Sequence, residues 1–220
     1  MTEQTTIAQA LALAFAEAGV KRMYGVPGGG SSLDLIEAAA AHDIPFTLTK
    51  TENAAVMMAG ALAETRGQPG VAIMTKGPGV ANAANGIAYA SLDRAPVIVV
   101  TDGFTPKQTQ YITHQVFDQQ AMLAPVVKGH SRLDGDDAAV QMRRLIALAC
   151  TAPFGPVHIE LTSEVAKRPL PGALPAMTPS VSPATSPVAQ FTAAFDLLRT
   201  ARRPVVVLGL EARRHAPDIL

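Results

Sequence analysis

The sequence predicts an α/β protein in which a roughly six-stranded, mainly parallel sheet carries helices on both faces. Short runs of apolar and β-branched residues alternate along the chain with longer segments of helical periodicity. This alternation is typical of a parallel sheet, because a crossover helix joins each strand to the next. The 220 residues, of which 48% are hydrophobic and 16% charged, can bury one sizeable core with some chain left over.

The elements follow one another from the N-terminus. Apolar residues at helical spacing follow Thr5 and Thr6, either of which could be the helix N-cap, and end at Gly19, a helix stop signal. We expect helices over residues 7–18, 33–41, 53–66, 80–91 and 137–150, and strands over residues 22–26, 46–49, 71–75, 97–101, 126–129 and 157–161. These elements form one closed domain, predicted to occupy residues 1–166.

A linker and the start of a second domain are expected after residue 166. Residues 168–187 contain six prolines, which exclude both a helix and a central strand, so residues 167–187 are predicted to run extended as a linker. Beyond it, residues 188–201 are predicted to form an amphipathic helix and residues 204–208 a buried strand. One helix and one strand cannot bury a core. We therefore expect residues 188–220 to begin a central α/β domain that is truncated here.

The charge balance and the single cysteine narrow the class of protein. Lys plus Arg and Asp plus Glu number 18 each, so no net charge attracts nucleic acid or a membrane surface. A lone Cys150 can form neither an internal disulfide nor a thiolate zinc site. The N-terminus carries no basic leader, and the longest apolar runs fall far short of the roughly 20 residues that span a bilayer. A cytoplasmic protein is expected.

Two glycine-rich loops each follow a predicted strand and open a helix, at residues 25–32 and 77–82. A helix N-terminus can hold an anion, but a dinucleotide motif would need a small residue at Leu33, and a P-loop would need Lys at Ser31. In the second loop Pro78 removes one amide and Asn82 replaces a third glycine. Two interpretations stay open: plain strand-to-helix turns, or turns that let a ligand approach the backbone closely.

Glu52 stands at another junction between a predicted strand and a helix. An acid in the first turn of a helix is usually only a favourable partner for the helix dipole. Here, however, Glu52 and both glycine loops lie at the carboxyl ends of parallel strands, the edge at which open α/β sheets bind their ligands. That convergence favours a ligand site.

Several motifs, in unbroken order over the first 165 residues, carry a resemblance to a known family. They are residues 24–29 (Tyr-Gly-Val-Pro-Gly-Gly), 51–55 (Thr-Glu-Asn-Ala-Ala), 71–82, 155–160 (Gly-Pro-Val-His-Ile-Glu), and Gln115 with residues 118–119 and 127–128. Together they resemble the pyrimidine-binding domain of thiamine diphosphate-dependent enzymes of the acetolactate synthase, 2-oxo acid decarboxylase and benzaldehyde lyase type. Residues 203–209 resemble the first strand of that family's central domain.

The resemblance implies roles for named residues. Glu52 would be the acid that hydrogen-bonds N1′ of the cofactor's aminopyrimidine and activates thiamine diphosphate. The residues expected to bind the cofactor are Pro27, Gly28, Glu52, Thr75, Pro78 and Asn82. Gln115 would donate a hydrogen bond to the substrate. His114 would either move a proton there or be an ordinary loop histidine.

Three positions depart from the family pattern and concern the substrate. Thr51 stands where many relatives carry another residue, often His, and Lys76 stands where acetolactate synthases usually carry Ser. Lys76 would either meet a carboxylate or an acyl-CoA phosphate, or point to solvent. Thr75 stands near the position of an active-site His in some decarboxylases, which argues mildly for carboligation over simple decarboxylation.

The resemblance also implies what this chain does not supply. The family binds the diphosphate through Mg²⁺ with a Gly-Asp-Gly motif and a later Asn in a third domain, and the acidic run at residues 133–137 does not fit that pattern. No metal ligand is expected here. The implied enzyme is a lyase or transferase acting on small 2-oxo acids, a homodimer or homotetramer whose site lies between subunits. The alternatives are a non-catalytic pyrimidine-domain module and one subunit of a split two-chain decarboxylase.

Overall fold

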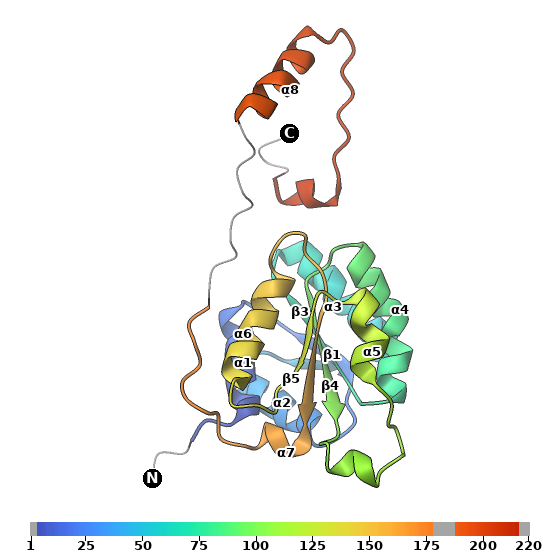
Figure 1. Ribbon diagram of the computed structural model, residues 1–220, viewed down its shortest axis with the longest axis vertical. Helices are drawn as coiled ribbons and strands as arrows, with labels where there is room; N and C mark the ends of the chain where they lie inside the picture. The colour runs from blue at the N-terminus through green and yellow to red at the C-terminus, as the bar shows by residue number, and fades with distance from the viewer. Residues whose placement is uncertain (1–3, 178–187, 216–220) are drawn as a thin grey trace. The chain divides into compact units, whose positions relative to one another are not determined.

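The computed structural model describes residues 4–177 and 188–215. These residues fall into two compact units on either side of the undescribed segment, and each unit is considered by itself. The first unit is a three-layered α/β domain with a sheet between two groups of helices (Figure 1). The predicted α/β class is therefore confirmed.

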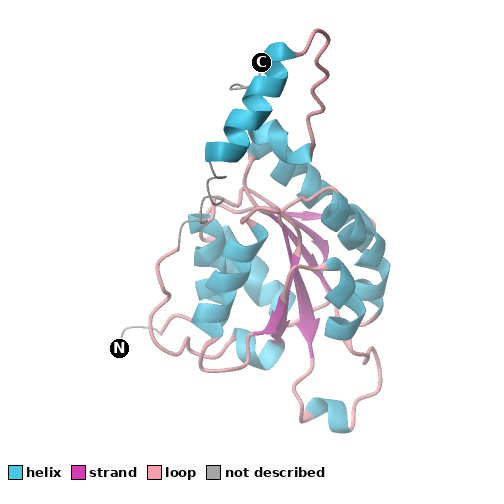
Figure 2. Cartoon of the chain, turned by 45° about the horizontal axis from the view of Figure 1, so that its top comes forward, coloured by secondary structure: helices cyan, strands magenta, loops and turns pink. Residues whose placement is uncertain are grey.

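The sheet has six strands, all joined in parallel in the order β2-β1-β3-β4-β6-β5. The strands are β1 (Met23–Val26), β2 (Phe46–Leu48), β3 (Gly70–Met74), β4 (Val97–Gly103), β5 (His130–Arg132) and β6 (Val157–Thr162). Figure 2 shows them as one continuous sheet surrounded by helices. The three central strands β3, β4 and β6 are buried along their whole length, as expected for a parallel sheet covered on both faces.

The helices of the first unit agree closely with the predicted periodicity. They are α1 (Ile7–Glu17), α2 (Ser31–Ala40), α3 (Glu52–Arg66), α4 (Pro78–Leu92), α5 (Gln119–Leu123), α6 (Ala138–Ala149) and α7 (Ser163–Ala166). Thr6 caps α1 in a capping box with Gln9. Gly67 ends α3 in the left-handed conformation, φ 68°, which glycine adopts without strain.

Two apolar clusters hold the helices to the sheet. Along β4, Ile98 and Val100 join the cluster formed with α1, α2 and α6, whereas Val97 and Val99 join the cluster formed with α3 and α4. This alternation follows from the two-residue period of a strand. The sheet therefore separates an α1/α2/α6 layer from an α3/α4 layer, and its carboxyl edge is left to the loops.

The fifth strand lies later than predicted. Residues 126–129 were expected to form it, but a 3₁₀ turn covers Ala124–Val126, and pairing with β6 begins at His130. Pro125 lies within that turn and has no N–H to give to a ladder. The apolar pair Val126 and Val127 instead packs against the cluster under α3 and α4.

The segment after α7 begins in contact with the first unit. Ile7 donates its backbone N–H to Arg168 O, and Leu170 donates to Thr5 O. The Arg143 guanidinium donates to Pro175 O at 2.7 Å. The expected linker over residues 167–187 thus starts against α1 and α6, and residues 178–187 of it lie outside the described residues. The proposed domain limits, 1–166 and 188–220, stay predictions.

The second unit contains helix α8 (Val188–Thr200) and a 3₁₀ turn, η3 (Leu210–His215). The helix was predicted. The strand expected at residues 204–208 does not form, and Val205 and Val207 are 86% and 89% exposed. A strand needs a hydrogen-bonding neighbour, and none pairs with this segment among the residues that the structure describes.

No helix among the described residues is long and apolar enough to cross a membrane.

Candidate functional site

The strand order brings the three predicted site segments together at the carboxyl edge of the sheet. Strand β1 lies between β2 and β3. The glycine loop after β1 is therefore flanked by Glu52, after β2, and by the Gly77 turn, after β3. Segments separated by about 25 residues each in sequence become neighbours at the edge where parallel sheets bind ligands.

Glu52 is the first residue of α3 and is half-buried. Thr51 caps the helix, accepting the N–H of Ala54 at 3.2 Å, and so fixes the start of α3 at Glu52. The Asn82 side-chain amide, from the second turn of α4, donates to the Glu52 carboxylate. Two predicted cofactor-binding residues are thus in direct contact.

Glycine backbone forms the wall beside this pair. A methyl group added to Gly79 would lie 3.3 Å from Glu52 Oε1 and 2.8 Å from Thr75 Cγ2. One added to Gly28 would lie 2.3 Å from Thr75 Oγ1. Thr75 therefore lies between the two glycines, and its side chain fills the space that a side chain at either position would need. Pro27 precedes Gly28, and Pro78 is the first residue of α4.

Both glycine loops end in the same backbone conformation. Gly30 caps α2 with φ 53° and ψ −116°, and Gly77 caps α4 with φ 66° and ψ −115°. Residues with a side chain rarely adopt these angles. A methyl group on Gly30 would also lie 1.9 Å from Ser163 Oγ, and one on Gly77 2.6 Å from the Gln115 carbonyl oxygen. Both turns consequently require glycine.

A buried carboxylate that the sequence analysis did not single out fixes the first loop. Asp102, 2% exposed near the end of β4, accepts the Ser32 N–H at 3.1 Å and the Ser32 hydroxyl at 2.9 Å. The Ser31 hydroxyl donates to the same oxygen, Oδ1. The carboxylate therefore satisfies the start of α2 from a neighbouring strand. Its other oxygen, Oδ2, is buried without a hydrogen-bond partner and lies beside Gly28.

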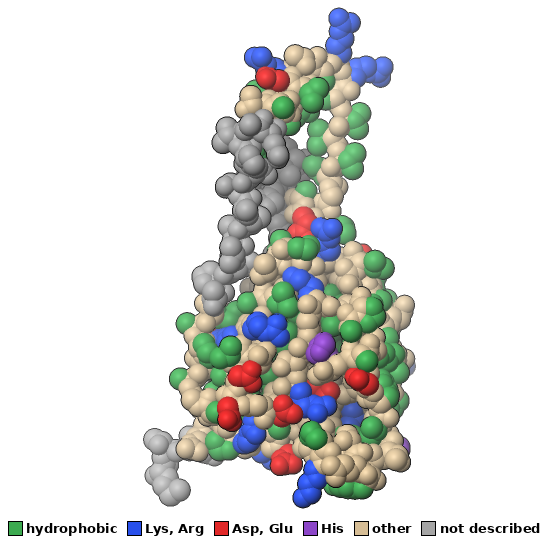
Figure 3. All heavy atoms as spheres, viewed as in Figure 1, with side chains coloured by type: hydrophobic (Ala, Val, Ile, Leu, Met, Phe, Trp, Pro, Cys, Tyr) green, Lys and Arg blue, Asp and Glu red, His purple; other side chains and the backbone are tan. Residues whose placement is uncertain are grey.

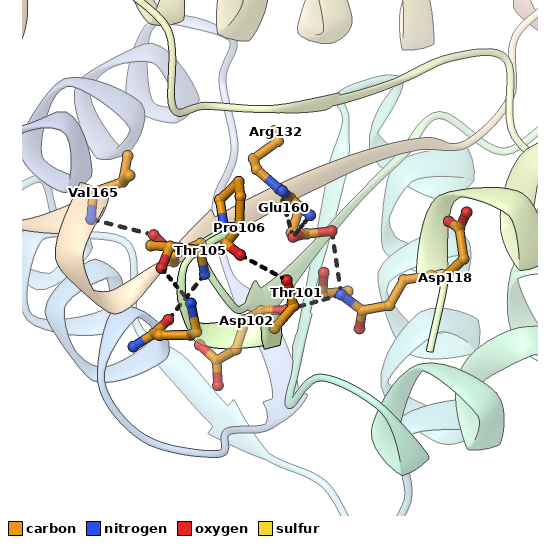
Figure 4. A network of polar contacts seen from close by, with 12 residues as sticks. Thr101, Asp102, Thr105, Pro106, Asp118, Arg132, Glu160 and Val165 are labelled. Atoms are coloured by element: carbon orange, nitrogen blue, oxygen red, sulfur yellow. Dashed lines mark hydrogen bonds and ion pairs between the residues drawn. The ribbon is translucent and has the colours of Figure 1, made fainter. Parts of the chain in front are cut away.

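A second network fixes the Gly77 turn, and its ion pair of Arg132 with Glu160 is seen in Figure 4. Gln119, 6% exposed at the start of α5, accepts the Gly77 N–H at 3.1 Å. It donates to the Asp102 carbonyl oxygen at 3.1 Å and to Glu160 Oε2 at 3.3 Å. Arg132 binds Glu160 Oε1 through Nε at 2.8 Å and Nη2 at 2.7 Å. Burial raises the pKa of the Glu160 carboxyl, against the lowering effects of Arg132 and Gln119.

A cavity of about 660 Å³ lies over this network. Lys76, Gln115, Arg132 and Glu160 are among its lining residues. Lys76 is half-buried, and its ammonium lies 4.6 Å from the centre of the Phe104 ring, a cation–π contact. Gln115 has φ 62° and rests against Gly77. His114 is exposed and does not line this cavity, so the structure does not bring it to the other site residues.

Comparison with known proteins agrees with this geometry. Residues 5–122, more than half of the chain, match the family model described as "Thiamine pyrophosphate enzyme, N-terminal TPP binding domain". The chain belongs to this family. The resemblance seen in the motifs is therefore confirmed at the level of the family.

Two groups of curated relatives in the thiamine pyrophosphate enzyme family match most of the chain. A probable acetolactate synthase large subunit of Methanocaldococcus jannaschii is 31% identical over 92% of this chain and 35% of its own length. The acetolactate synthase isozyme 3 large subunit of Escherichia coli is 35% identical over 67% of this chain and 26% of its own. A probable 2-ketoarginine decarboxylase of Pseudomonas aeruginosa is 30% identical over 93% of this chain and 37% of its own. The chain thus spans about a third of these relatives.

A solved structure shares the fold. The thiamine diphosphate-dependent 4-hydroxybenzoylformate decarboxylase of Rhodococcus jostii superposes with a TM-score of 0.82 and 19% identity, over 93% of this chain and 39% of that chain. At this identity the likeness supports the fold alone. The six-stranded sheet with helices on both faces is therefore the arrangement of a thiamine diphosphate enzyme domain.

The residues at the sheet edge fit the aminopyrimidine part of that cofactor. Glu52 offers a carboxyl group at the edge, beside Gly79, and the Asn82 amide donates to it. No group of three or more His, Cys, Asp or Glu side chains is placed to hold a metal ion within residues 4–177 and 188–215.

The residues missed by sequence reasoning belong to the two networks. Asp102 carried a usable signal, because a charged residue ends the apolar run of β4. Gln119 lay within the motif at residues 118–119, but no role was assigned to it, since its partners are 17, 41 and 42 residues away. On the face seen in Figure 3, acidic and basic side chains of the first unit are intermingled.

Proposed function

We propose that this chain supplies the pyrimidine-binding half of a thiamine diphosphate site in a carboligase or decarboxylase that acts on 2-oxo acids, with Glu52 as the residue that activates the cofactor. The observation that carries the proposal is the position of Glu52. It is a half-buried carboxyl at the carboxyl edge of the sheet, held by Asn82 and faced by the bare backbone of Gly79.

The role of Glu52 follows from its chemistry. Thiamine diphosphate, when bound, supplies a nucleophilic carbon for attack on the carbonyl group of a 2-oxo acid. Glu52 would hold a proton at N1′ of the aminopyrimidine. Asn82 would orient the Glu52 carboxyl by its existing hydrogen bond. Pro27, Gly28, Thr75 and Pro78 would bound the slot, as their positions around the loops support.

The substrate side of the site is proposed for the loop after β4. Gln115 would donate a hydrogen bond to the substrate, because it rests on the Gly77 turn and lines the cavity with Lys76. His114 would act in proton transfer only if its loop changed position, since the side chain is exposed. The names of the relatives, acetolactate synthase and 2-ketoarginine decarboxylase, support a small 2-oxo acid as the substrate class.

The remaining half of the site is proposed to lie outside this chain. The described residues hold no metal-ligand cluster, and the curated relatives are about three times longer. We infer that Mg²⁺ and the diphosphate are bound by a further domain, supplied across a homodimer or homotetramer interface. A cytoplasmic location is proposed on the same family basis.

The test is the substitution Glu52→Gln in the full-length product of the gene that encodes this chain. The amide keeps the size of the side chain but cannot hold the carboxyl proton at N1′. We expect exchange of the C2 proton of bound thiamine diphosphate, followed by NMR after acid quench, to slow about 10²- to 10⁴-fold. Turnover of pyruvate should fall in parallel. Glu37→Gln, an exposed position on α2, is the matched control. Near-normal exchange of the C2 proton in Glu52→Gln would contradict the proposed role of Glu52.

A further inference from the structure

We propose that Gln119 is a positioning residue that fixes the Gly77 turn and thereby the Glu52 site, and that the ion pair between Glu160 and Arg132 sets the orientation of the Gln119 amide. The inference rests on the proposed role of Glu52. It concerns a side chain that forms no hydrogen bond with Glu52 and contacts the slot loops by a hydrogen bond to Gly77, and it is carried by the buried network around that side chain.

Every hydrogen-bonding group of the Gln119 amide is in use. Its oxygen accepts the N–H of Gly77 at 3.1 Å. Its nitrogen donates one hydrogen to the Asp102 carbonyl oxygen at 3.1 Å and directs the other to Glu160 Oε2 at 3.3 Å. The side chain is 6% exposed, so water does not replace these partners readily. The amide therefore links the ends of three strands, β3, β4 and β6.

The partners permit only one orientation of this amide. Turning it over would place its NH₂ group against the Gly77 N–H and its oxygen against the Glu160 carboxylate. Arg132 holds that carboxylate in place through two contacts, at 2.7 and 2.8 Å. The carboxylate and the Asp102 carbonyl oxygen both require a donor, so the amide oxygen must face Gly77. The ion pair between Arg132 and Glu160 thus determines which way the Gln119 amide is oriented.

The Gly77 turn passes this constraint on to Glu52. Gly77 is buried and caps α4 in a conformation that only glycine adopts freely. Because it precedes the first turn of the helix, its N–H has no acceptor within α4. The first two turns of α4 contain Gly79, beside Glu52 Oε1, and Asn82, bonded to Glu52 Oε2. Without the Gln119 acceptor the Gly77 N–H would be buried and unpaired, and relief of that cost would displace the start of α4.

The same turn supports the substrate loop. Gln115, with φ 62°, places its carbonyl oxygen, Cα and Cβ against Gly77. Gln119 begins the short helix α5, which Asp118 caps through the N–H of Ala121 at 2.9 Å. One buried amide consequently fixes the position of the Gly77 turn relative to the end of the Gln115 loop.

The experiment compares Gln119→Leu with Gln141→Leu in the full-length protein. Gln141 lies on α6, away from the site, and also loses a hydrogen bond, from Nε2 to Asp137 at 2.7 Å. C2-proton exchange is measured per folded protein at saturating thiamine diphosphate. We expect Gln119→Leu to slow exchange about 10- to 100-fold, as a displacement of about 1 Å can, and Gln141→Leu to stay within about twofold. A merely structural role would lower stability without changing exchange in the saturated, folded protein.

A second variant covers the case in which Gln119→Leu does not fold. Arg132→Met removes the partly exposed cation and leaves Gln119 in place. It frees the Glu160 carboxylate, so we expect a smaller slowing of exchange, about 3- to 10-fold. Exchange equal to that of Gln141→Leu in either folded variant overturns the inference. Glu52→Gln is measured alongside. If it too exchanges normally, the proposed function fails, whereas a slow Glu52→Gln with a normal Gln119→Leu rejects only the positioning role.

Discussion

His158 should make the stability of this protein depend on pH. The imidazole lies on β6 in the centre of the sheet and is fully buried, and its Nε2 is 2.8 Å from Thr101 Oγ1. Its Nδ1 has no hydrogen-bond partner. Burial, assisted by the charge of nearby His130, lowers the pKa of His158 from 6.5 to about 3. The fold therefore accepts the neutral ring only.

The sign and size follow from proton linkage. Between pH 6.5 and about pH 3 the unfolded chain binds a proton at this ring that the folded chain excludes. Stability is therefore fully present above pH 6.5 and is lost as the pH falls, by about 1.4 kcal/mol for each pH unit. From pH 6.5 to pH 5 the expected loss of unfolding free energy attributable to His158 is about 2 kcal/mol, a large share of the stability of an ordinary domain.

The assay is urea unfolding of the chain at pH 7, 6 and 5, followed by far-ultraviolet circular dichroism. The wild-type protein is compared with His158→Gln, because the difference between the two profiles cancels the contributions of other groups. His42→Gln, beyond the end of α2, is the control and should keep the wild-type profile. A difference between wild type and His158→Gln that stays constant from pH 7 to pH 5 would refute the buried neutral imidazole.

Three further perturbations test the supports of the site. Gly77→Ala should cost about 1–3 kcal/mol of unfolding free energy, and Gly67→Ala less, because Gly67 shares its positive φ but has open space around it. Asp102→Ala should lower stability by about 1–3 kcal/mol, since it strips a buried acceptor from Ser32; an unchanged urea midpoint would contradict this. The pKa of Glu160 is raised, whereas that of His158 is lowered, so ionisation of Glu160 lowers the unfolding free energy as the pH rises above 4.5. Glu160→Gln should reduce this loss of unfolding free energy with pH.

The fold was predictable from the sequence because its signals are local. Helix periodicity, caps such as Thr6 and stops such as Gly19 lie within a few residues of one another. The strand misplaced at residues 126–129 shows the limit of that approach. Val126 and Val127 are residues that favour strands, yet they pack against the apolar cluster under α4. Which residues form β5 is decided by hydrogen bonding to β6, some 30 residues later.

The site was predictable in part for the same reason. Glu52 and the glycine loops stand at strand-to-helix junctions, which a sequence marks clearly, and strand order brings them together. Gln119 was part of a motif, but its role could not be inferred, because its hydrogen-bond partners come from β4, β6 and the turn after β3. His114 illustrates the converse. Its residue type suits proton transfer, but its loop leaves the ring exposed.

The Gly77 turn belongs to both halves of this arrangement. On one side, the loops after β2, β1 and β3 form the slot with Glu52. On the other, the segments at the ends of β4, β6 and β5 form the network that ends in the ion pair of Arg132 with Glu160. Among the described residues, hydrogen bonds join the two halves at Gly77, whose N–H Gln119 accepts, and at Ser31 and Ser32, which donate to the Asp102 carboxylate. A change at Arg132 should therefore reach Glu52 through this turn, whereas changes on α1 or α6 should alter stability alone.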